Sequence, residues 1–205
     1  RPVGFQLVQV PDRNGPALNV AVWYPTDTGA RPSLLGLTVQ FVASDAPVAG
    51  TALPLVVISH GNGGGPGSHV DTALALASAG FVVAAPMHTG DNYADQSAVG
   101  KPDWLVARSR HIPAVIDYMA TAWPDRARID ASRIGVFGFS AGAFTALTTI
   151  GGAPDLALIA EHCAKAPEFA CQLWKPGGAA IRAPESFARD ARVKAAVIAA
   201  PGYGF

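Results

Sequence analysis

The sequence predicts an α/β fold, in which a mostly parallel β-sheet is covered by helices on both faces. Five segments rich in Val, Ile and Phe are separated by helix-length or Gly/Pro-marked connections, which is typical of parallel strands joined by crossovers. Four of the five are almost continuously apolar, as strands buried on both faces are. The chain of 205 residues is 50% hydrophobic and 15% charged, which indicates an ordered globular protein. Residues 1–205 are therefore expected to form one domain.

The expected elements follow in chain order. The alternating segment 18–25 (LNVAVWYP) predicts an early antiparallel strand at the edge of the sheet. Helical spacing of apolar residues predicts helices over 69–79 and 105–122, and Pro113 leaves the start of the second helix open because proline suits a first helical turn. The near-continuous apolar runs predict four buried strands, which start at Leu53, Gly80, Arg133 and Val193.

Two segments between these elements are irregular, polar and rich in Pro and Gly. They cover residues 89–103 and 153–189. Connections of this composition run over the surface and carry binding and catalytic residues. We expect both segments above the sheet, the second as a lid-like excursion.

Charge and hydropathy exclude several classes of partner. Lys plus Arg and Asp plus Glu are equal at 15 each, and no basic or acidic run stands out. A nucleic acid or an anionic membrane surface is therefore not an expected partner. The long uncharged windows are interrupted by Gly, Pro or polar residues, so they predict buried strands and helices rather than membrane spans. The chain begins at Arg1 without an apolar signal-peptide core, which fits either removal of a leader or trimming.

The two cysteines, Cys163 and Cys171, lie close together in a segment that contains Pro167. This spacing predicts a disulfide that closes a small loop, with two unrelated buried thiols as the alternative. A disulfide indicates an oxidising compartment, so a periplasmic or secreted protein is expected. His162 is the only histidine nearby, and therefore no zinc site is expected here; the sequence indicates no metal and no cofactor.

Ser140 lies in the segment 133–144 (RIGVFGFSAGAF), between a predicted strand and a predicted helix. A nucleophilic serine needs a hydroxyl exposed on a tight turn, and the flanking Gly138 and Gly142 permit the close approach of strand and helix that a sharp elbow requires. The helix that begins at Ala141 places its first amides and its dipole beside the serine oxygen. Ser140 is therefore a candidate nucleophile, with an ordinary serine in a glycine-rich chain as the alternative.

A glycine-rich loop follows the first buried strand, with the sequence HGNGGG over residues 60–65. Four glycines in five positions leave backbone N–H groups unobstructed, so this loop is a candidate for the second donor to an oxyanion. The alternatives are a flexible turn and a phosphate cradle. The loop lacks the Gly-Lys-Ser/Thr that would follow in a phosphate-binding loop, which argues against the cradle.

Four motifs together resemble one known family: LPLVVISHGNGGG, GFVVAAPMHTGDN, IDASRIGVFGFSAGAF and RVKAAVIAAPG. In this order they are similar to α/β-hydrolases of the dienelactone hydrolase-like group, close to the bacterial relatives of platelet-activating-factor acetylhydrolase. The resemblance covers most of the chain, including the opening segment 3–26. It implies the α/β-hydrolase fold and a serine esterase in which Ser140 attacks the ester carbonyl. It also implies that the amides of Asn62 and Ala141 form the oxyanion hole, while His60 has a structural role in its turn.

The sequence departs from this family pattern after Ser140. In the family, an acid and then a histidine follow later strands, whereas here His162 is the only later histidine and the chain stops at Phe205. One reading is a complete small fold with His162 or His88 as the base. The other is that a C-terminal portion with the acid, the base and two more strands is missing or forms a separate polypeptide cut from the same precursor. An apolar strand over 195–201 left at the sheet edge favours the second reading.

The function expected from these features is hydrolysis of a small-molecule or lipid-like carboxylic ester through an acyl-enzyme on Ser140. Two alternatives stay open. A peptidase or amidase would use the same fold and the same nucleophile, and a non-catalytic member of the fold would only bind a ligand. The aromatic candidates for an apolar pocket, with ordinary packing as the alternative, are Tyr93, Trp104, Trp123, Phe144 and Trp174.

Overall fold

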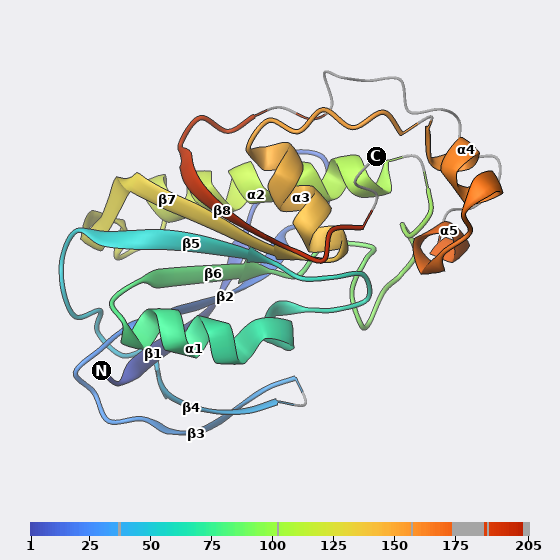
Figure 1. Cartoon of the computed structure of the whole chain (residues 1–205). Coiled ribbons are helices and arrows are strands. Elements are labelled where there is room, and N and C mark those ends of the chain that lie inside the picture. The colour runs from blue at the N-terminus through green and yellow to red at the C-terminus, as the bar shows by residue number, and fades with distance from the viewer. Residues whose placement is uncertain (37, 102, 157, 174–186, 188, 203–205) are drawn as a thin grey trace.

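The structure, a computed structural model, describes residues 1–36, 38–101, 103–156, 158–173, 187 and 189–202. Within these residues, eight strands form one mixed sheet in the order β3-β4-β1-β2-β6-β5-β7-β8 (Figure 1). The first half of the sheet is mainly antiparallel, with β1 paired to β2 along its whole length. It consists of β1 (Val3–Val10), β2 (Leu18–Pro25), β3 (Arg31–Leu35) and β4 (Thr38–Ser44).

The second half of the sheet is parallel. It consists of β5 (Leu53–Ser59), β6 (Val82–Pro86), β7 (Ile129–Phe139) and β8 (Val193–Ala199). β5 lies between β6 and β7, and β8 pairs with the outer side of β7. These are the four strands that the continuous apolar runs predict, and their carboxyl ends all meet at the same side of the sheet.

Helices cover both faces of the sheet, as predicted. On one face, the short helix η1 (Pro66–His69) leads into α1 (Val70–Ser78), which packs on β2 and β6. On the other face lie α2 (Trp104–Thr121) and α3 (Ala141–Thr149) (Figure 1). Each face has its own apolar core, because side chains of alternate strand positions point to opposite sides. The short helix η2 (Arg126–Arg128) precedes β7.

The predicted place of the strand over residues 18–25 is wrong. β2 is antiparallel, as expected, but it lies between β1 and β6 rather than at the edge of the sheet. The strands β1, β3 and β4, which the apolar pattern does not reveal, extend the sheet beyond it. Seven of the eight residues of β2 are buried, because helices and strands cover both of its sides.

Two further details differ from the sequence prediction. Pro113 does not mark a helix start: α2 begins at Trp104 and contains Pro113 in its interior. The segment 153–189, expected to be irregular, contains α4 (Leu158–Lys165) and α5 (Phe169–Leu173), while its residues 157, 174–186 and 188 lie outside the described part. The segment 89–103 has no regular helix or strand in its described residues, as expected.

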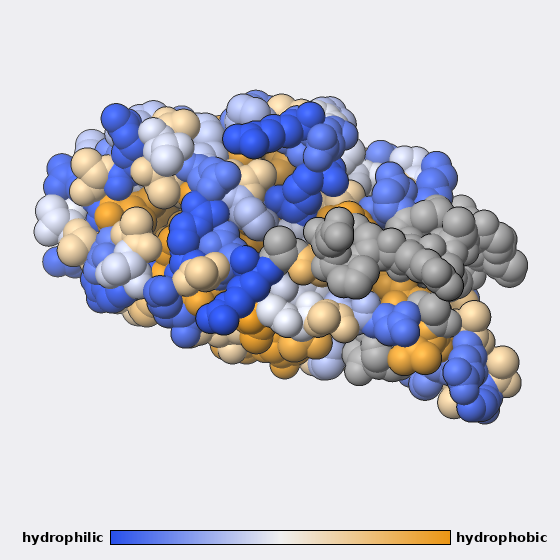
Figure 2. All heavy atoms as spheres, turned by 90° about the horizontal axis from the view of Figure 1, so that it is seen from above, coloured by the Kyte–Doolittle hydropathy of each residue, from blue (hydrophilic) through white to orange (hydrophobic). Residues whose placement is uncertain are grey.

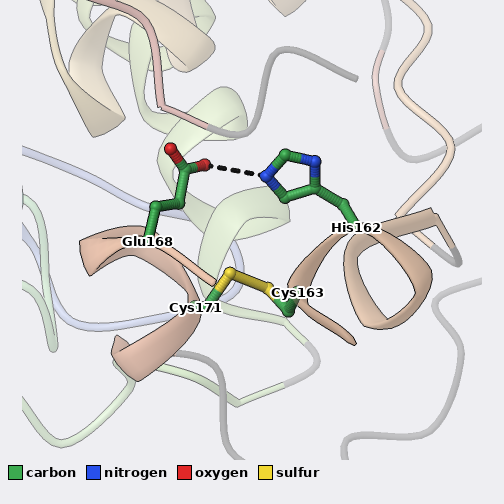
Figure 3. Close-up of a disulfide and its surroundings, with 4 residues drawn as sticks. All are labelled: His162, Cys163, Glu168 and Cys171. Atoms are coloured by element: carbon green, nitrogen blue, oxygen red, sulfur yellow. Dashed lines mark hydrogen bonds and ion pairs between the residues drawn. A yellow bond between two sulfur atoms is a disulfide. The ribbon is translucent and has the colours of Figure 1, made fainter. Parts of the chain in front are cut away.

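The predicted disulfide is present between Cys163 of α4 and Cys171 of α5, with 5.6 Å between the two Cα atoms (Figure 3). His162 Nε2 and Glu168 Oε1, 3.2 Å apart, form a second link across the same loop. By loop-closure entropy, a bridge of this span contributes about 2.5 kcal/mol to the free energy of unfolding. The two short helices are thus tied to each other by covalent and polar contacts.

The surface is mixed in polarity. Figure 2 shows the molecule from above, which is the side on which α2 and α3 lie. On this side, hydrophilic residues are interrupted by smaller apolar areas. Among the described helices, none has both the length and the apolar character needed to cross a membrane.

Buried polar side chains form a continuous chain beside α2. His111 Nε2 lies 3.5 Å from Asp12 Oδ2, His111 Nδ1 lies 3.0 Å from His88 Nδ1, and His88 Nε2 lies 2.9 Å from Ser59 Oγ. A carboxylate only accepts, so His111 donates to Asp12, His88 donates to His111, and the Ser59 hydroxyl donates to His88. This order requires both imidazoles to be neutral. Burial lowers the pKa of His88 well below 6.5 and that of His111 to about 4.

We expect the free energy of unfolding to fall when the pH drops from about 6.5 towards about 4. In the unfolded chain, histidine binds a proton near pH 6.5, whereas burial lowers the folded pKa of His60 to about 3, that of His111 to about 4 and that of His88 well below 6.5. Because the pKa of each buried histidine is lower in the folded than in the unfolded chain, acidification below pH 6.5 protonates the unfolded chain first. The stability that neutral histidines contribute is therefore fully present above pH 6.5 and is lost as the pH falls. Urea unfolding at a series of pH values measures this, and His111→Gln should reduce the slope. Stability that stays constant or rises on acidification would contradict the expectation.

Candidate active site

Ser140 joins the end of β7 to the start of α3 in a strained conformation. Its backbone has φ 54° and ψ −119°, a region that residues other than glycine rarely adopt and that concentrates at functional sites. Hydrogen bonds hold it there: the Ser140 carbonyl accepts from the amides of Ala143 (2.9 Å) and Phe144 (3.2 Å). The Ser140 amide donates to the Ala199 carbonyl of β8 over 3.0 Å. The strand, turn and helix expected around this serine are all present.

The two glycines that flank Ser140 are required by backbone packing. A Cβ atom on Gly142 would overlap the Ser59 carbonyl at the end of β5, and a Cβ atom on Gly138 would overlap the Gly142 carbonyl. The backbones of β5, β7 and α3 therefore meet at a distance that leaves no room for any side chain. This is the close approach that a sharp nucleophile turn needs.

The two amides predicted for an oxyanion hole belong to elements that meet beside Ser140. Ala141 is the first residue of α3, so its N–H has no carbonyl partner within the helix. The glycine-rich loop begins next to the serine, because a Cβ atom on Gly61 would lie 3.4 Å from the Ser140 Cβ atom. Within the described residues, the backbone N–H of Asn62 has no hydrogen-bond acceptor, whereas its side-chain amide donates to Asp91.

His60, at the start of this loop, uses both ring nitrogens in contacts with the backbone. Its Nδ1 donates to the Gly61 carbonyl over 2.7 Å, and its Nε2 accepts from the His88 amide over 3.2 Å. The side chain is buried, and burial lowers its pKa to about 3. His60 therefore holds the end of β5 against the end of β6 and has no ring nitrogen left for Ser140.

None of the five histidines is hydrogen-bonded to the Ser140 hydroxyl in the described part of the chain. His88 and His111 belong to the buried polar chain, and His162 contacts Glu168. His69 packs edge-on against Phe137 and Phe139. Neither His88 nor His162, the two bases considered for a complete small fold, contacts the candidate nucleophile in this arrangement.

β8 is the edge strand of the sheet in the described residues, with β7 as its neighbour. Its Val197 is 56% exposed, and Phe139 on the neighbouring strand is 43% exposed. Phe139 pairs with Ala199, two residues after Val197, so both side chains point to the same face of the sheet. That apolar strip next to Ser140 is accessible, and pairing of a further strand with β8 stays a prediction.

The candidate pocket aromatics are mostly core residues. Trp123 packs against Tyr24, and Trp104 and Phe144 belong to a cluster that joins α2 and α3 to α4. Tyr93 is 66% exposed and lies against the glycine-rich loop, while Trp174 lies outside the described residues. Ordinary packing therefore accounts for the three buried aromatic residues.

Sequence reasoning did not identify Asp91 and Arg108, a fully buried ion pair behind the glycine-rich loop, with 2.6 Å between Arg108 Nη1 and Asp91 Oδ2. A signal was nevertheless present in the helix. Arg108 lies three residues after Leu105 and four before Ile112, which places a cation on the buried apolar stripe of α2. A charge in such a position is rarely buried unless it is paired.

Comparisons with known proteins agree with the α/β-hydrolase fold. The family model for platelet-activating factor acetylhydrolase, isoform II, matches residues 34–105. No curated protein matches the chain. Among solved structures, ferulic acid esterase from Streptomyces cinnamoneus is similar with a TM-score of 0.60 and 25% identity, over 71% of this chain and 54% of its own. A hypothetical protein from Pseudomonas aeruginosa has a TM-score of 0.50 and 22% identity, over 72% and 39%. The chain thus spans about half the length of the esterase.

We expect Gly142→Ala to lower the free energy of unfolding by about 2 kcal/mol or more, because the new Cβ atom forces α3 away from β5. Gly29→Ala is the matched control, since nothing lies within 4 Å of a Cβ atom at that position. Urea denaturation of the two variants measures the difference. Equal stability of the two variants would show that the close approach of β5 and α3 is not required.

Proposed function

We propose that this chain, which has an α/β-hydrolase fold and resembles the platelet-activating factor acetylhydrolases, hydrolyses carboxylic esters through an acyl-enzyme on Ser140. The observation that carries this proposal is the positive φ of Ser140 between two glycines that admit no side chain. Maintaining such a conformation costs on the order of 1–3 kcal/mol, and such strain concentrates at active sites. A protein that only binds a ligand has no need for this turn.

In the proposed reaction, the Ser140 hydroxyl oxygen attacks the carbonyl carbon of the ester while a base removes its proton. The carbonyl oxygen becomes an oxyanion, which the amides of Asn62 and Ala141 stabilise together with the N-terminal dipole of α3. Collapse of this intermediate breaks the bond to the alcohol, which leaves with the proton taken up by the base, and the acyl group stays on Ser140. Water, deprotonated by the same base, then attacks the acyl-enzyme through the same oxyanion geometry; the acid is released and the proton returns to the Ser140 oxygen.

The proposed source of the base and its carboxylate is a C-terminal segment outside this chain. Three features support it: the Ser140 hydroxyl has no histidine partner among the described residues, β8 is an edge strand, and the apolar strip of Phe139 and Val197 is exposed. The fact that the chain covers 54% of the ferulic acid esterase agrees with this. A strand added beside β8 would pair with its free edge, and the loop after that strand would bring a histidine near Ser140. The crossover helix that joins parallel strands would cover the strip.

The proposed substrate is a small-molecule or lipid-like carboxylic ester. The solved structure with 25% identity is named as a ferulic acid esterase, which favours ester over amide hydrolysis. The disulfide between Cys163 and Cys171 supports an oxidising location, and we propose that the protein is periplasmic or secreted.

Replacing Ser140 by Ala should lower ester hydrolysis by about 10⁴-fold or more, because loss of a serine nucleophile removes the acyl-enzyme route. Labelling by a fluorophosphonate probe should disappear as well. The variant should keep the unfolding midpoint within a few degrees, since the Ser140 hydroxyl makes no hydrogen bond in the described structure. Labelling at the same rate in the variant would refute the role of Ser140.

Intact mass analysis of the active protein, purified from its natural source, tests the proposed C-terminal segment. We expect either a longer chain or a second polypeptide that carries a histidine and an acid. Substituting that histidine should reduce hydrolysis to the level of Ser140→Ala. An active protein that consists of residues 1–205 alone would overturn this part of the proposal.

A further inference from the structure

We infer that the buried ion pair of Asp91 and Arg108 positions both amides of the oxyanion hole, so that these two side chains are positioning residues for the reaction. The inference rests on the proposed function. Neither side chain reaches the reacting atoms; each acts on the two segments that carry the amides, the glycine-rich loop and the first turn of α3.

Asp91 holds the glycine-rich loop from behind. Its Oδ1 accepts from Asn62 Nδ2 and from the Gly63 amide, each over 2.8 Å, and its Oδ2 accepts from Trp104 Nε1 and Arg108 Nη1, each over 2.6 Å. All four acceptor positions of the carboxylate are thus used. The hydrogen bond from Asn62 Nδ2 holds the Asn62 side chain, and the hydrogen bond from the Gly63 amide holds the peptide group between Asn62 and Gly63.

Arg108 reaches both segments from α2. Its Nη2 donates to the carbonyl of His60, the first residue of the glycine-rich loop, and its Nε donates to Thr145 Oγ1 over 3.4 Å. The Thr145 hydroxyl in turn donates to the Ala141 carbonyl over 3.0 Å. The guanidinium therefore connects the start of the loop with the first turn of α3.

The loop needs such support because its sequence does not hold it in place. Four of the five residues 61–65 are glycines, which lose more conformational freedom on ordering than any other residue. Asn62 is the residue in 61–65 that has a side chain, and this side chain donates a hydrogen bond to Asp91. Burial raises the pKa of Asp91, but the charge of Arg108 and the hydrogen bonds to the carboxylate lower it overall. The loop is thus bound by an ionised group, whose hydrogen bonds are stronger than neutral ones.

Asn62→Ala separates positioning from simple structural support. The variant keeps the backbone N–H proposed for the oxyanion and leaves no buried charge unpaired, but it removes the contact with Asp91. We expect kcat for a p-nitrophenyl ester to fall by about tenfold or more with KM within about twofold, because an oxyanion donor acts in the transition state. The unfolding midpoint should change little.

A second variant, Asp91→Leu with Arg108→Met, removes both charges together, because a single substitution would leave one buried charge unpaired and prevent folding. Here kcat should fall by about 100-fold, since both segments lose their support. Amide exchange at Gly63, measured by NMR, should be at least about tenfold faster in both variants. Asp117→Asn is the matched control: Asp117 lies on the same helix, α2, the substitution breaks an exposed ion pair with Arg192, and it should change neither kcat nor exchange.

The outcomes separate this inference from the proposed function. If the full protein, together with the proposed C-terminal segment, shows no Ser140-dependent turnover, the proposed function is overturned, and the exchange measurement then still decides the inference. An unchanged rate of amide exchange at Gly63 in both folded variants would overturn the inference. Turnover in the wild type together with unchanged kcat in both folded variants would overturn the inference and leave the proposed function in place.

Discussion

The contact between the backbone of α3 and the end of β5 is the constraint on which the rest of the structure depends. Gly142 lies so close to the Ser59 carbonyl that no Cβ atom fits, and Gly138 has the same restriction towards Gly142. This closeness forces Ser140 into a positive φ. Its cost, on the order of 1–3 kcal/mol, is offset by burial of α3, whose Ala143 and Phe144 are at most 1% exposed. The strained turn is therefore held by the packing of the whole helix.

Buried polar side chains lie behind this contact and form hydrogen bonds with the residues at the end of β5. Ser59 ends β5 and His60 follows it, and their partners are His88 after β6 and Arg108 on α2. Buried polar groups stabilise a fold when their hydrogen bonds are complete and destabilise it when one partner is missing. In the described residues, the buried side-chain atoms without a partner are Gln40 Nε2 and His69 Nε2, and neither belongs to this network. The network thus gives one defined geometry to the ends of β5 and β6.

The sequence predicted the parallel half of the sheet because strands buried on both faces are continuously apolar, as β5 and β8 illustrate. It misplaced β2, since an alternating strand looks half-exposed and the pattern does not reveal that β1 and β4 lie beyond it. Leu34 and Phe41, which are 70% and 64% exposed, show why β3 and β4 gave no clear alternation of buried and exposed residues. The strand-to-helix turn at Ser140 was readable from adjacent residues. The partnership of Asp91 and Arg108 was not, because seventeen residues separate them and only the fold brings them together.

We propose Ser140 as a nucleophile whose oxyanion is stabilised by the amides of Asn62 and Ala141. A crystal structure of the active protein after reaction with a fluorophosphonate ester tests it most directly, because the phosphonyl oxygen occupies the place of the oxyanion. We expect a covalent bond to Ser140 Oγ and the phosphonyl oxygen within about 3 Å of both amide nitrogens. A phosphonyl oxygen that faces away from both amides, or an adduct on another residue, would contradict it.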